Sequence, residues 1–256
     1  MRKWERYCIL REDERIQPFL PETRLLTEEN LLSLLDTKDE VILKPVSGSG
    51  GSGVIIVSLE GNNRILVQEK LSKHTTTKSD LFSFLAEYIL KEFTPYIDRS
   101  EINTILEKSY MVQHRISLAT VDECPFDIRV MVQRKADLPW KITGTLAKIA
   151  SSGYAITNVN LGATLVPVEN ALQRSSLNKF PQQELLSQLD LVALLAVERL
   201  QQHFPSLQMI GFDLCFDSEG KAWMIEANFK PDDYIFLELE DKTMYQTIRE
   251  YSEGSK

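Results

Sequence analysis

The sequence predicts an α+β fold, in which antiparallel strands and helices are mixed without a regular strand–helix alternation. Short apolar runs return on themselves after tight turns, as in 54–57, the turn at 61–63 and 65–67, and this pattern is typical of β-hairpins. A long stretch over 182–204 carries leucines at helical spacing, which predicts a helix packed against other elements. Frequent hairpins favour α+β over a doubly wound parallel sheet.

The composition is that of a globular protein with an acidic balance. The 256 residues include 29 Lys and Arg against 37 Asp and Glu, for a formal net charge of −8. This excess of acid argues against a general nucleic-acid binder, which needs a basic surface. The sequence has no apolar run of about 18 residues and no apolar leader, so we expect neither a membrane span nor a secretory signal. Three distant cysteines without metal spacing predict a reduced, cytoplasmic protein.

The first 40 residues are predicted to form an N-terminal helical segment. The charge-rich stretch 2–15 predicts one helix. Thr27, followed by two glutamates, predicts the start of a second helix that runs through Leu35. A hydroxyl side chain caps the first turn, and acid is stabilised near the positive end of the helix dipole.

The later elements follow from apolar runs and turn residues. The predicted strands lie at 41–43, 54–57, 65–67, 110–112, 127–134, 140–149, 209–217 and 221–228. Helices are predicted over 79–92, over 182–204 and in the last 15 residues. His74 lies in a polar stretch that we interpret as a solvated loop, and Asp217 is interpreted as a turn residue before Ser218-Glu219-Gly220.

A glycine-rich loop follows the first of these strands. Its glycines are Gly48, Gly50, Gly51 and Gly53. Such a backbone can direct several N–H groups at an anion, most often phosphate. The Walker A pattern fails because Val54 and Ile55 stand where Lys and Ser or Thr are needed, and the dinucleotide fingerprint fails because a strand follows the loop.

Two interpretations of the loop remain, a phosphate-binding flap between two strands and a solvated flexible loop. A kinase-like flap lacks support, since the sequence has neither the catalytic His-Arg-Asp nor Asp-Phe-Gly. Lys44, at the end of the preceding strand, favours the phosphate-binding flap because it puts a cation at the base of the loop.

The last predicted hairpin carries a cluster of oxygen ligands. With Ser218-Glu219 at the centre of the turn, Asp213 lies opposite Met224 and diagonal to Glu226, and Asn228 is next on the same face. Two carboxylates and an amide on an apolar hairpin are costly unless they are neutralised, and Mg²⁺ takes such ligands. The alternative is a solvent-facing strand edge with ordinary acids.

The motifs, and their order along the chain, resemble those of the ATP-grasp superfamily. They are Lys44-Pro45, Gly48 to Gly53, Gln113-His114-Arg115, Asp127-Ile128-Arg129, Thr157-Asn158, Asp213 and Glu226-Ala227-Asn228. The resemblance covers roughly residues 40–235. Leu20-Pro21-Glu22-Thr23 and Pro125-Phe126-Asp127 look most like the YheC/YheD-type ATP-grasp proteins, which are associated with the endospore coat.

The resemblance implies two α+β lobes that grip ATP. The lobe with the glycine flap would span 41–115 and the lobe with the metal site 116–240, followed by a helix or tail over 241–256. Lys44 and the flap would hold the phosphates. The hinge backbone at His114 and Arg115, preceded by Gln113, would meet the adenine edge.

The same resemblance assigns roles in the second lobe. Asp127 would contact the nucleotide, and Asn158 would lie beside the phosphates. One or two Mg²⁺ ions, or Mn²⁺, would be held by Asp213, Glu226 and Asn228. Arg129 and Lys148 are the candidate catalytic cations, which would stabilise charge on the phosphoryl group. Lys148 stands where relatives carry Arg, and for Arg129 the alternative is a strand arginine paired with a surface acid.

The implied activity is an ATP-dependent carboxylate–amine ligase. A small-molecule or peptide carboxylate would become an acyl phosphate, which an amine or similar nucleophile then attacks. The segment before Lys44 is shorter than the preceding domain of typical ligases, so acceptor binding would fall to residues 1–40, to a partner chain or to a large acceptor. We expect a cytoplasmic protein with an association with the spore. The alternatives are an ATP-binding coat or scaffold protein without turnover and an ATP-dependent phosphotransferase.

Overall fold

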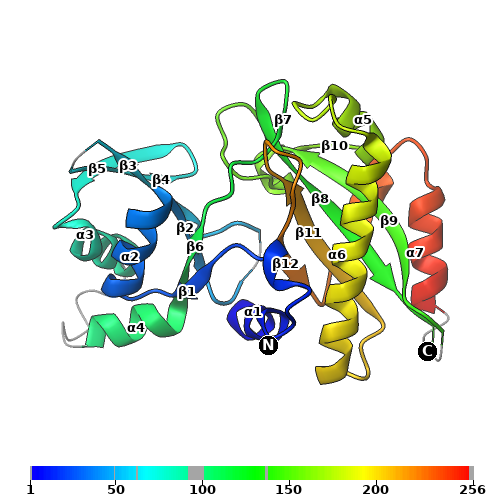
Figure 1. Ribbon diagram of the computed structural model, residues 1–256, viewed down its shortest axis with the longest axis horizontal. Helices are drawn as coiled ribbons and strands as arrows, with labels where there is room; N and C mark the ends of the chain where they lie inside the picture. Colours follow the sequence, from blue (N-terminus) through cyan, green and yellow to red (C-terminus); the bar gives the residue numbers. More distant parts are fainter. Residues whose placement is uncertain (1, 49, 62, 92–100, 136–137, 254–256) are drawn as a thin grey trace. The chain divides into compact units, whose positions relative to one another are not determined.

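The computed structural model describes residues 2–48, 50–61, 63–91, 101–135 and 138–253 (Figure 1). The chain divides into two compact units. The glycine-loop unit comprises Pro21–Ile116, and the acidic-hairpin unit comprises Lys3–Leu20 together with Ser117–Lys256. The predicted segment 1–40 is therefore shared, because its first half packs with the acidic hairpin and its second half with the glycine loop.

The glycine-loop unit is built on a six-stranded antiparallel sheet. The sheet order is β1-β6-β2-β3-β4-β5. Its strands are β1 (Thr23–Leu25), β2 (Glu40–Pro45), β3 (Ile55–Glu60), β4 (Arg64–Glu69), β5 (Ser72–Thr77) and β6 (Tyr110–His114). Its helices are α2 (Glu28–Lys38), α3 (Leu81–Leu90) and α4 (Ile102–Ser109). Alternate apolar residues of the central strands, such as Val41 and Leu43 of β2, join the leucines of α2 in one core.

The start of α2 is as predicted. The side chain of Thr27 accepts a hydrogen bond from the backbone N–H of Asn30 at 3.1 Å, and two glutamates follow in the first turn. The helix continues past Leu35 to Lys38 and ends at Asp39, whose φ of 57° turns the chain into β2. A local sequence signal therefore fixes where this helix begins, while its end depends on the turn that follows.

The prediction of a loop around His74 is wrong. His74 lies in β5, which pairs with β4 so that His74 stands opposite Val67. This strand, Ser72–Thr77, is polar on both faces and largely exposed, so it has no apolar alternation to identify it. The short strands β1, β7 and β10 and the helices α4 and α5 were missed for a similar reason, because each is too short to show a period.

The acidic-hairpin unit contains the second sheet, with strand order β10-β9-β8-β11-β12, and β7 pairs with β8. Its strands are β7 (Thr120–Val121), β8 (Cys124–Gln133), β9 (Lys141–Ile149), β10 (Thr164–Val166), β11 (Met209–Phe216) and β12 (Ala222–Asn228). Its helices are α1 (Lys3–Arg11), α5 (Val168–Arg174), α6 (Gln182–His203) and α7 (Thr243–Glu253). The 3₁₀ helices are η1 (Gln17–Phe19), η4 (Val159–Leu161) and η5 (Tyr234–Glu238).

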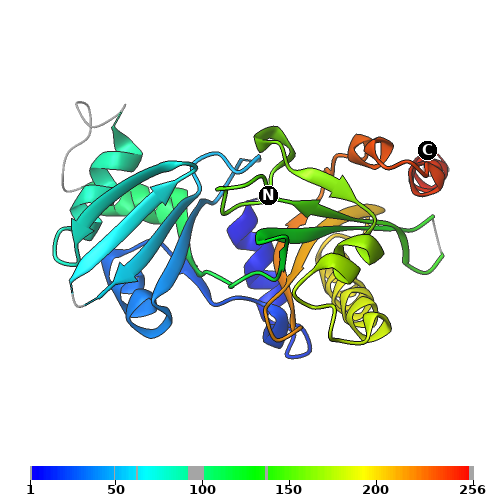
Figure 2. The same ribbon diagram turned by 90° about the horizontal axis from the view of Figure 1, so that it is seen from above.

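Helices cover both faces of this sheet (Figure 2). Val130 and Ala147 of the central strands join the core beneath α6. Their neighbours Met131 and Leu146 point to the other face, where they pack with Ile248 of α7. Because side chains alternate along a strand, the two central strands β8 and β9 are buried on both sides and read as nearly continuous apolar runs.

The observed elements agree with the predicted α+β class. Both sheets are antiparallel throughout their described pairs, and the long helix α6 spans nearly the predicted residues. The predicted C-terminal helix is α7, and residues 254–256 of that prediction lie outside the described ranges. No helix in the described part of the chain is both long and apolar enough to cross a bilayer.

Candidate functional site

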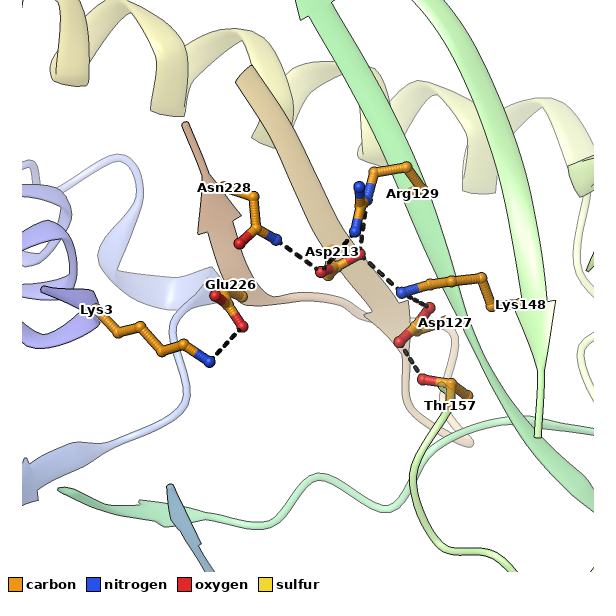
Figure 3. Close-up of polar contacts among 8 residues, drawn as sticks. All are labelled: Lys3, Asp127, Arg129, Lys148, Thr157, Asp213, Glu226 and Asn228. Carbon is orange, nitrogen blue, oxygen red and sulfur yellow. Dashed lines mark hydrogen bonds and ion pairs between the residues drawn. The ribbon is translucent and has the colours of Figure 1, made fainter. Parts of the chain in front are cut away.

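The centre of the candidate site is the carboxylate of Asp213, which is buried on β11 with 8% exposure (Figure 3). Arg129, opposite it on β8, donates from Nε to Oδ1 at 2.9 Å and from Nη2 to Oδ2 at 3.3 Å. Lys148 Nζ donates to Oδ1 at 2.9 Å, and Asn228 Nδ2 donates to Oδ2 at 3.0 Å. Residues from four adjacent strands therefore meet on one carboxylate.

The register of the acidic hairpin differs from the predicted one. Asp213 pairs directly with Glu226, whereas the turn geometry predicted Met224 opposite it. The reason is a β-bulge between Asp213 and Leu214, which leaves Ile225 as an extra residue on β12. The two carboxylates are thus directly across from each other rather than diagonal, and like charges in that position repel unless cations hold them.

A second buried carboxylate, Asp127, lies beside the first. Asp127 on β8 is opposite Lys148 on β9, and Lys148 Nζ is 2.9 Å from Asp127 Oδ1. Thr157 donates a hydrogen bond to the other carboxylate oxygen. Lys148, only 6% exposed, therefore lies between Asp127 and Asp213 and neutralises both in part. Asn158, next to Thr157, caps η4 by accepting the N–H of Asn160 at 2.8 Å.

The two buried carboxyl groups differ in proton affinity. Burial raises the pKa of Asp127 to about 6; Lys148 opposes this shift and the charge of Asp213 adds to it. Burial also disfavours the charge on Asp213, but Arg129 and Lys148 outweigh burial and hold the pKa of that carboxyl well below its usual range. Burial lowers the pKa of each cation, and the carboxylates more than reverse this effect.

Glu226 has a cationic partner that the sequence analysis missed. Lys3 of α1 places its Nζ 3.0 Å from Glu226 Oε2, with 12% of the lysine and 22% of the glutamate side chain exposed. The two residues are 223 positions apart, and a lysine in a charge-rich helix carries no signal of such a contact. α1 is therefore part of the candidate site.

The predicted metal ligands come together in the structure, but cations already hold their carboxylates. Asp213, Glu226 and Asn228 offer only oxygen as ligand atoms, which suits Mg²⁺. Within the described ranges, no group of three His, Cys, Asp or Glu side chains could hold a metal ion. A divalent cation held by the three predicted ligands would use the Asn228 amide oxygen and compete with Lys3 for Glu226. The metal assignment stays a prediction.

Lys44 in the glycine-loop unit is buried near the end of β2. Only 9% of Lys44 is exposed, and its Nζ donates to Gln113 Oε1 at 2.7 Å. Gln113 Nε2 in turn donates to Thr23 Oγ1 at 2.8 Å. Gln113 therefore orients a lysine ammonium on the neighbouring strand.

The glycine loop needs glycine for two separate reasons. Gly48, Gly50, Gly51 and Gly53 all have positive φ angles, between 69° and 100°. At Gly53 a Cβ atom would also lie 2.7 Å from Tyr110 Oη and 3.1 Å from Pro45 Cγ, whereas a Cβ at Gly48 would meet open space. Close packing thus fixes the loop at Gly53. Phosphate binding by the loop stays a prediction.

The predicted hinge residues use their backbone N–H groups inside the glycine-loop unit. The N–H of His114 donates to Glu22 O at 2.8 Å, and that of Arg115 donates to Glu40 O at 3.3 Å. The Arg115 guanidinium also pairs with the Glu40 carboxylate at 2.8 Å. These N–H groups are engaged, so the predicted contact with adenine would need other backbone groups.

Gly211 is a positioning residue that the sequence analysis did not identify. A Cβ atom there would lie 2.6 Å from Pro231 Cβ, 3.2 Å from Arg129 Cδ and 3.3 Å from Met131 Sδ. The missing side chain gives the Arg129 side chain room to cross the strand toward Asp213. An isolated glycine inside an apolar strand is the available signal, since it often marks a close approach.

Comparisons with known proteins agree on one family. A family model described as YheC/D like ATP-grasp matches residues 1–252. The chain is 27% identical over 238 residues to the endospore coat-associated protein YheD of Bacillus subtilis (strain 168), covering 91% of this chain and 49% of that protein. It is 24% identical over 230 residues to the endospore coat-associated protein YheC of the same organism, covering 90% and 59%. The chain thus spans about half the length of these relatives.

Two solved structures share the fold. One is an ADP complex of N5-carboxyaminoimidazole ribonucleotide synthetase, with a TM-score of 0.55 and 13% identity over 97% of this chain and 50% of the other. The second is the D-cycloserine synthetase DcsG, with a TM-score of 0.54 and 10% identity over 98% and 69%. At these identities the likeness concerns the fold alone.

We expect the Asp127 carboxyl to titrate near pH 6 in protein freed of metal with EDTA. Its folded-state pKa lies above that of the unfolded chain, so the stability it contributes is complete below pH ~4 and is lost as the pH rises through ~6, by up to about 3 kcal/mol. The pKa of the Asp213 carboxyl is lowered in the folded protein, so the stability that it contributes is lost as the pH falls, below the range in which Asp127 titrates. Carbon-13 NMR of the aspartate carboxyls, assigned with Asp127→Asn, measures the midpoint. A midpoint below pH 4.5 would contradict this account.

Gly211→Ala is expected to lower the free energy of unfolding by about 1–3 kcal/mol, because the new methyl group overpacks against Pro231. Urea unfolding measures the loss. In a double-mutant cycle, Pro231→Gly should recover part of it by removing the Cβ atom that clashes. Strictly additive losses would show that the close contact at Gly211 does not set this constraint.

Proposed function

The chain belongs to the YheC/D-like ATP-grasp family, and on that premise we propose that it is an ATP- and Mg²⁺-dependent carboxylate–amine ligase. In the proposed reaction, a carboxylate oxygen of the acid attacks the γ-phosphorus of ATP and ADP leaves. An amine or a similar nucleophile then attacks the carbonyl carbon of the acyl phosphate, releasing inorganic phosphate and a proton.

One observation carries the proposal. Four charged side chains with little solvent exposure form a network on one face of the sheet, next to Glu226. They are those of Asp127, Arg129, Lys148 and Asp213. Burying four charged groups costs free energy that well-packed apolar residues would avoid. Networks with perturbed pKa values of this kind are frequent at functional sites. The network therefore supports a site that handles charge rather than a purely structural sheet.

The chain's cations suit a phosphoryl-transfer site. Negative charge spreads over the phosphoryl oxygens during the transfer, and fixed cations stabilise it. Arg129 and Lys148 are preorganised for this task because carboxylates hold them in place. Lys44 is oriented by the side-chain amide of Gln113. We assign Lys44 and the glycine loop to the phosphates of ATP.

The metal assignment rests on ligand chemistry. Asp213, Glu226 and Asn228 are the residues proposed to hold Mg²⁺, which would neutralise phosphate charge when bound. Arg129 fixes the orientation of Asp213 through both carboxylate oxygens. Lys3 pairs with Glu226, so metal binding would exchange one cation for another at this carboxylate.

The names of the relatives add two elements to the proposal. Both structural neighbours are described as synthetases, which supports ligase chemistry. Both curated relatives are described as endospore coat-associated, which supports a role linked to the spore. The chain spans only about half of those relatives, so we propose the spore link for the shared region alone.

One observation favours the second candidate, an ATP-binding coat or scaffold protein without turnover. Both oxygens of Asp213 already accept hydrogen bonds from the chain, and Glu226 is paired with Lys3. A site that neutralises its own charges can persist as a stable structure without catalysis. Turnover is therefore the property to measure.

The test is phosphate release with product identification. Purified protein is incubated with Mg²⁺, ATP and a small-molecule extract of the source organism, and the products are examined by mass spectrometry. A new condensed product together with inorganic phosphate supports the ligase. A released phosphorylated product with ADP would instead establish a phosphotransferase, and ATP binding without turnover would establish the scaffold protein.

Lys44→Met should weaken Mg-ATP binding by at least about tenfold, because it removes a charge-assisted contact with phosphate. Methionine nearly matches the length of the buried side chain, so the fold should survive. Isothermal titration calorimetry measures the affinity. Lys38→Met, on the exposed end of α2, is the matched control and should bind normally. Equal affinities for both variants would remove Lys44 from the site.

Glu226→Gln should lower Mg²⁺-dependent phosphate release by at least about tenfold, since the amide is a poorer ligand for Mg²⁺. Asp217→Asn is the control on the same hairpin. The Asp217 carboxylate accepts the N–H groups of Glu219 and Lys221 at 3.0 Å each, and therefore serves the turn. We expect this variant to keep its turnover. If it proved as damaging as Glu226→Gln, the proposed division of roles along the hairpin would be wrong.

A further inference from the structure

Helix α1 directs two cations toward the end of β12. Lys3 and Arg6 are one helical turn apart and share a face of the helix. Lys3 reaches Glu226, as Figure 3 shows, and the Arg6 guanidinium lies 5.4 Å from the centre of the Phe229 ring. Phe229 is itself packed edge-on against Phe204, with ring centres 5.1 Å apart. The aromatic contact thus supports the guanidinium from one side.

The guanidinium of Arg6 has a donor that the described part of the protein does not satisfy. Arg6 Nε is buried, and it has no hydrogen-bond acceptor among the described residues. A buried donor without an acceptor is destabilising, and most such groups in proteins have a partner. Burial also lowers the pKa of Arg6, an effect that the charges of Glu226 and Glu5 oppose only in part.

Arg6 has no ion-pair partner among the described residues, although the charges of Glu226 and Glu5 both act on it. Lys3 already pairs with Glu226 at 3.0 Å, so Arg6 adds a second cation beside a carboxylate that is occupied. A further anionic group next to the Arg6 guanidinium would compensate its charge. A carboxylate suits this position because its two oxygens match the parallel N–H groups of a guanidinium.

We propose that Lys3 and Arg6 of α1 form a carboxylate-binding site beside Glu226, and that it holds the acid substrate. The assignment to the substrate rests on the proposed ligase function, whereas the carboxylate-binding site itself does not. The cations would hold the acid next to the residues assigned to Mg²⁺. Residues of the N-terminal helix would then take part in binding the acid substrate.

The first test measures carboxylate binding without ATP. Protein labelled with nitrogen-15 arginine is titrated with acetate at constant ionic strength, and the Arg6 Nε–H signal is followed by NMR. The signal is assigned through its loss in Arg6→Lys. We expect a saturable shift, which Lys3→Met should weaken at least threefold. Arg11→Lys, an exposed control at the end of the same helix, should leave the shift unchanged.

Three results of this titration would overturn the carboxylate-binding site. They are the absence of a saturable shift with acetate, an equal shift with chloride, and saturation by inorganic phosphate but not by acetate. Circular dichroism establishes that each variant is folded. If Lys3→Met were unfolded, titration of the unaltered protein with acetate, chloride and inorganic phosphate would still decide between these results.

The second test uses the acid substrate identified by phosphate release. Arg6→Lys should raise the KM for that acid at least tenfold and leave the KM for ATP nearly unchanged. Unchanged KM values would overturn the substrate assignment while the ligase function stands. Saturable acetate binding in a protein that never releases phosphate would instead contradict the ligase function and leave the carboxylate-binding site in place.

Discussion

The bidentate pairing of Arg129 with the buried Asp213 carboxylate is the interaction on which the acidic-hairpin unit depends. A carboxylate can be buried in a sheet only if nearly every lone pair is used and its charge is compensated. Lys148 and Asn228 complete that requirement from the two flanking strands. The strand order β9-β8-β11-β12 therefore brings together the side chains that neutralise Asp213, and the same order forms the apolar core.

Two backbone features serve this arrangement. The β-bulge after Asp213 aligns Glu226 with it, and the missing side chain at Gly211 leaves room for Arg129. The bulge interrupts the pairing of the two strands. The helix α6 supplies the packing that compensates, because its buried residues cover the sheet face opposite α7. The polar centre and the apolar core are thus built from the same strands.

The fold class and most of the longer helices and strands could be predicted from the sequence, because apolar periodicity marks elements such as α6 and the acidic hairpin. It also grouped Asp213, Glu226 and Asn228 correctly on one hairpin. It could not give the register, since a bulge leaves no trace in the turn residues. Contacts between distant segments, such as Lys3 with Glu226, were beyond reach because no local pattern encodes them. The burial of Lys44 depends on the neighbouring strand in the same way.

The polar edge strand β5 has a consequence for the behaviour of the protein at high concentration. A strand at the end of a sheet presents backbone groups that another chain could pair with, which is a common route to aggregation. In the described sheet, β5 lies at one end and carries Lys73, His74 and a run of threonines instead of apolar side chains. A hydrated, partly charged edge discourages the growth of the sheet into fibrils. The lack of apolar alternation makes β5 difficult to predict from the sequence, and it also opposes aggregation through this edge.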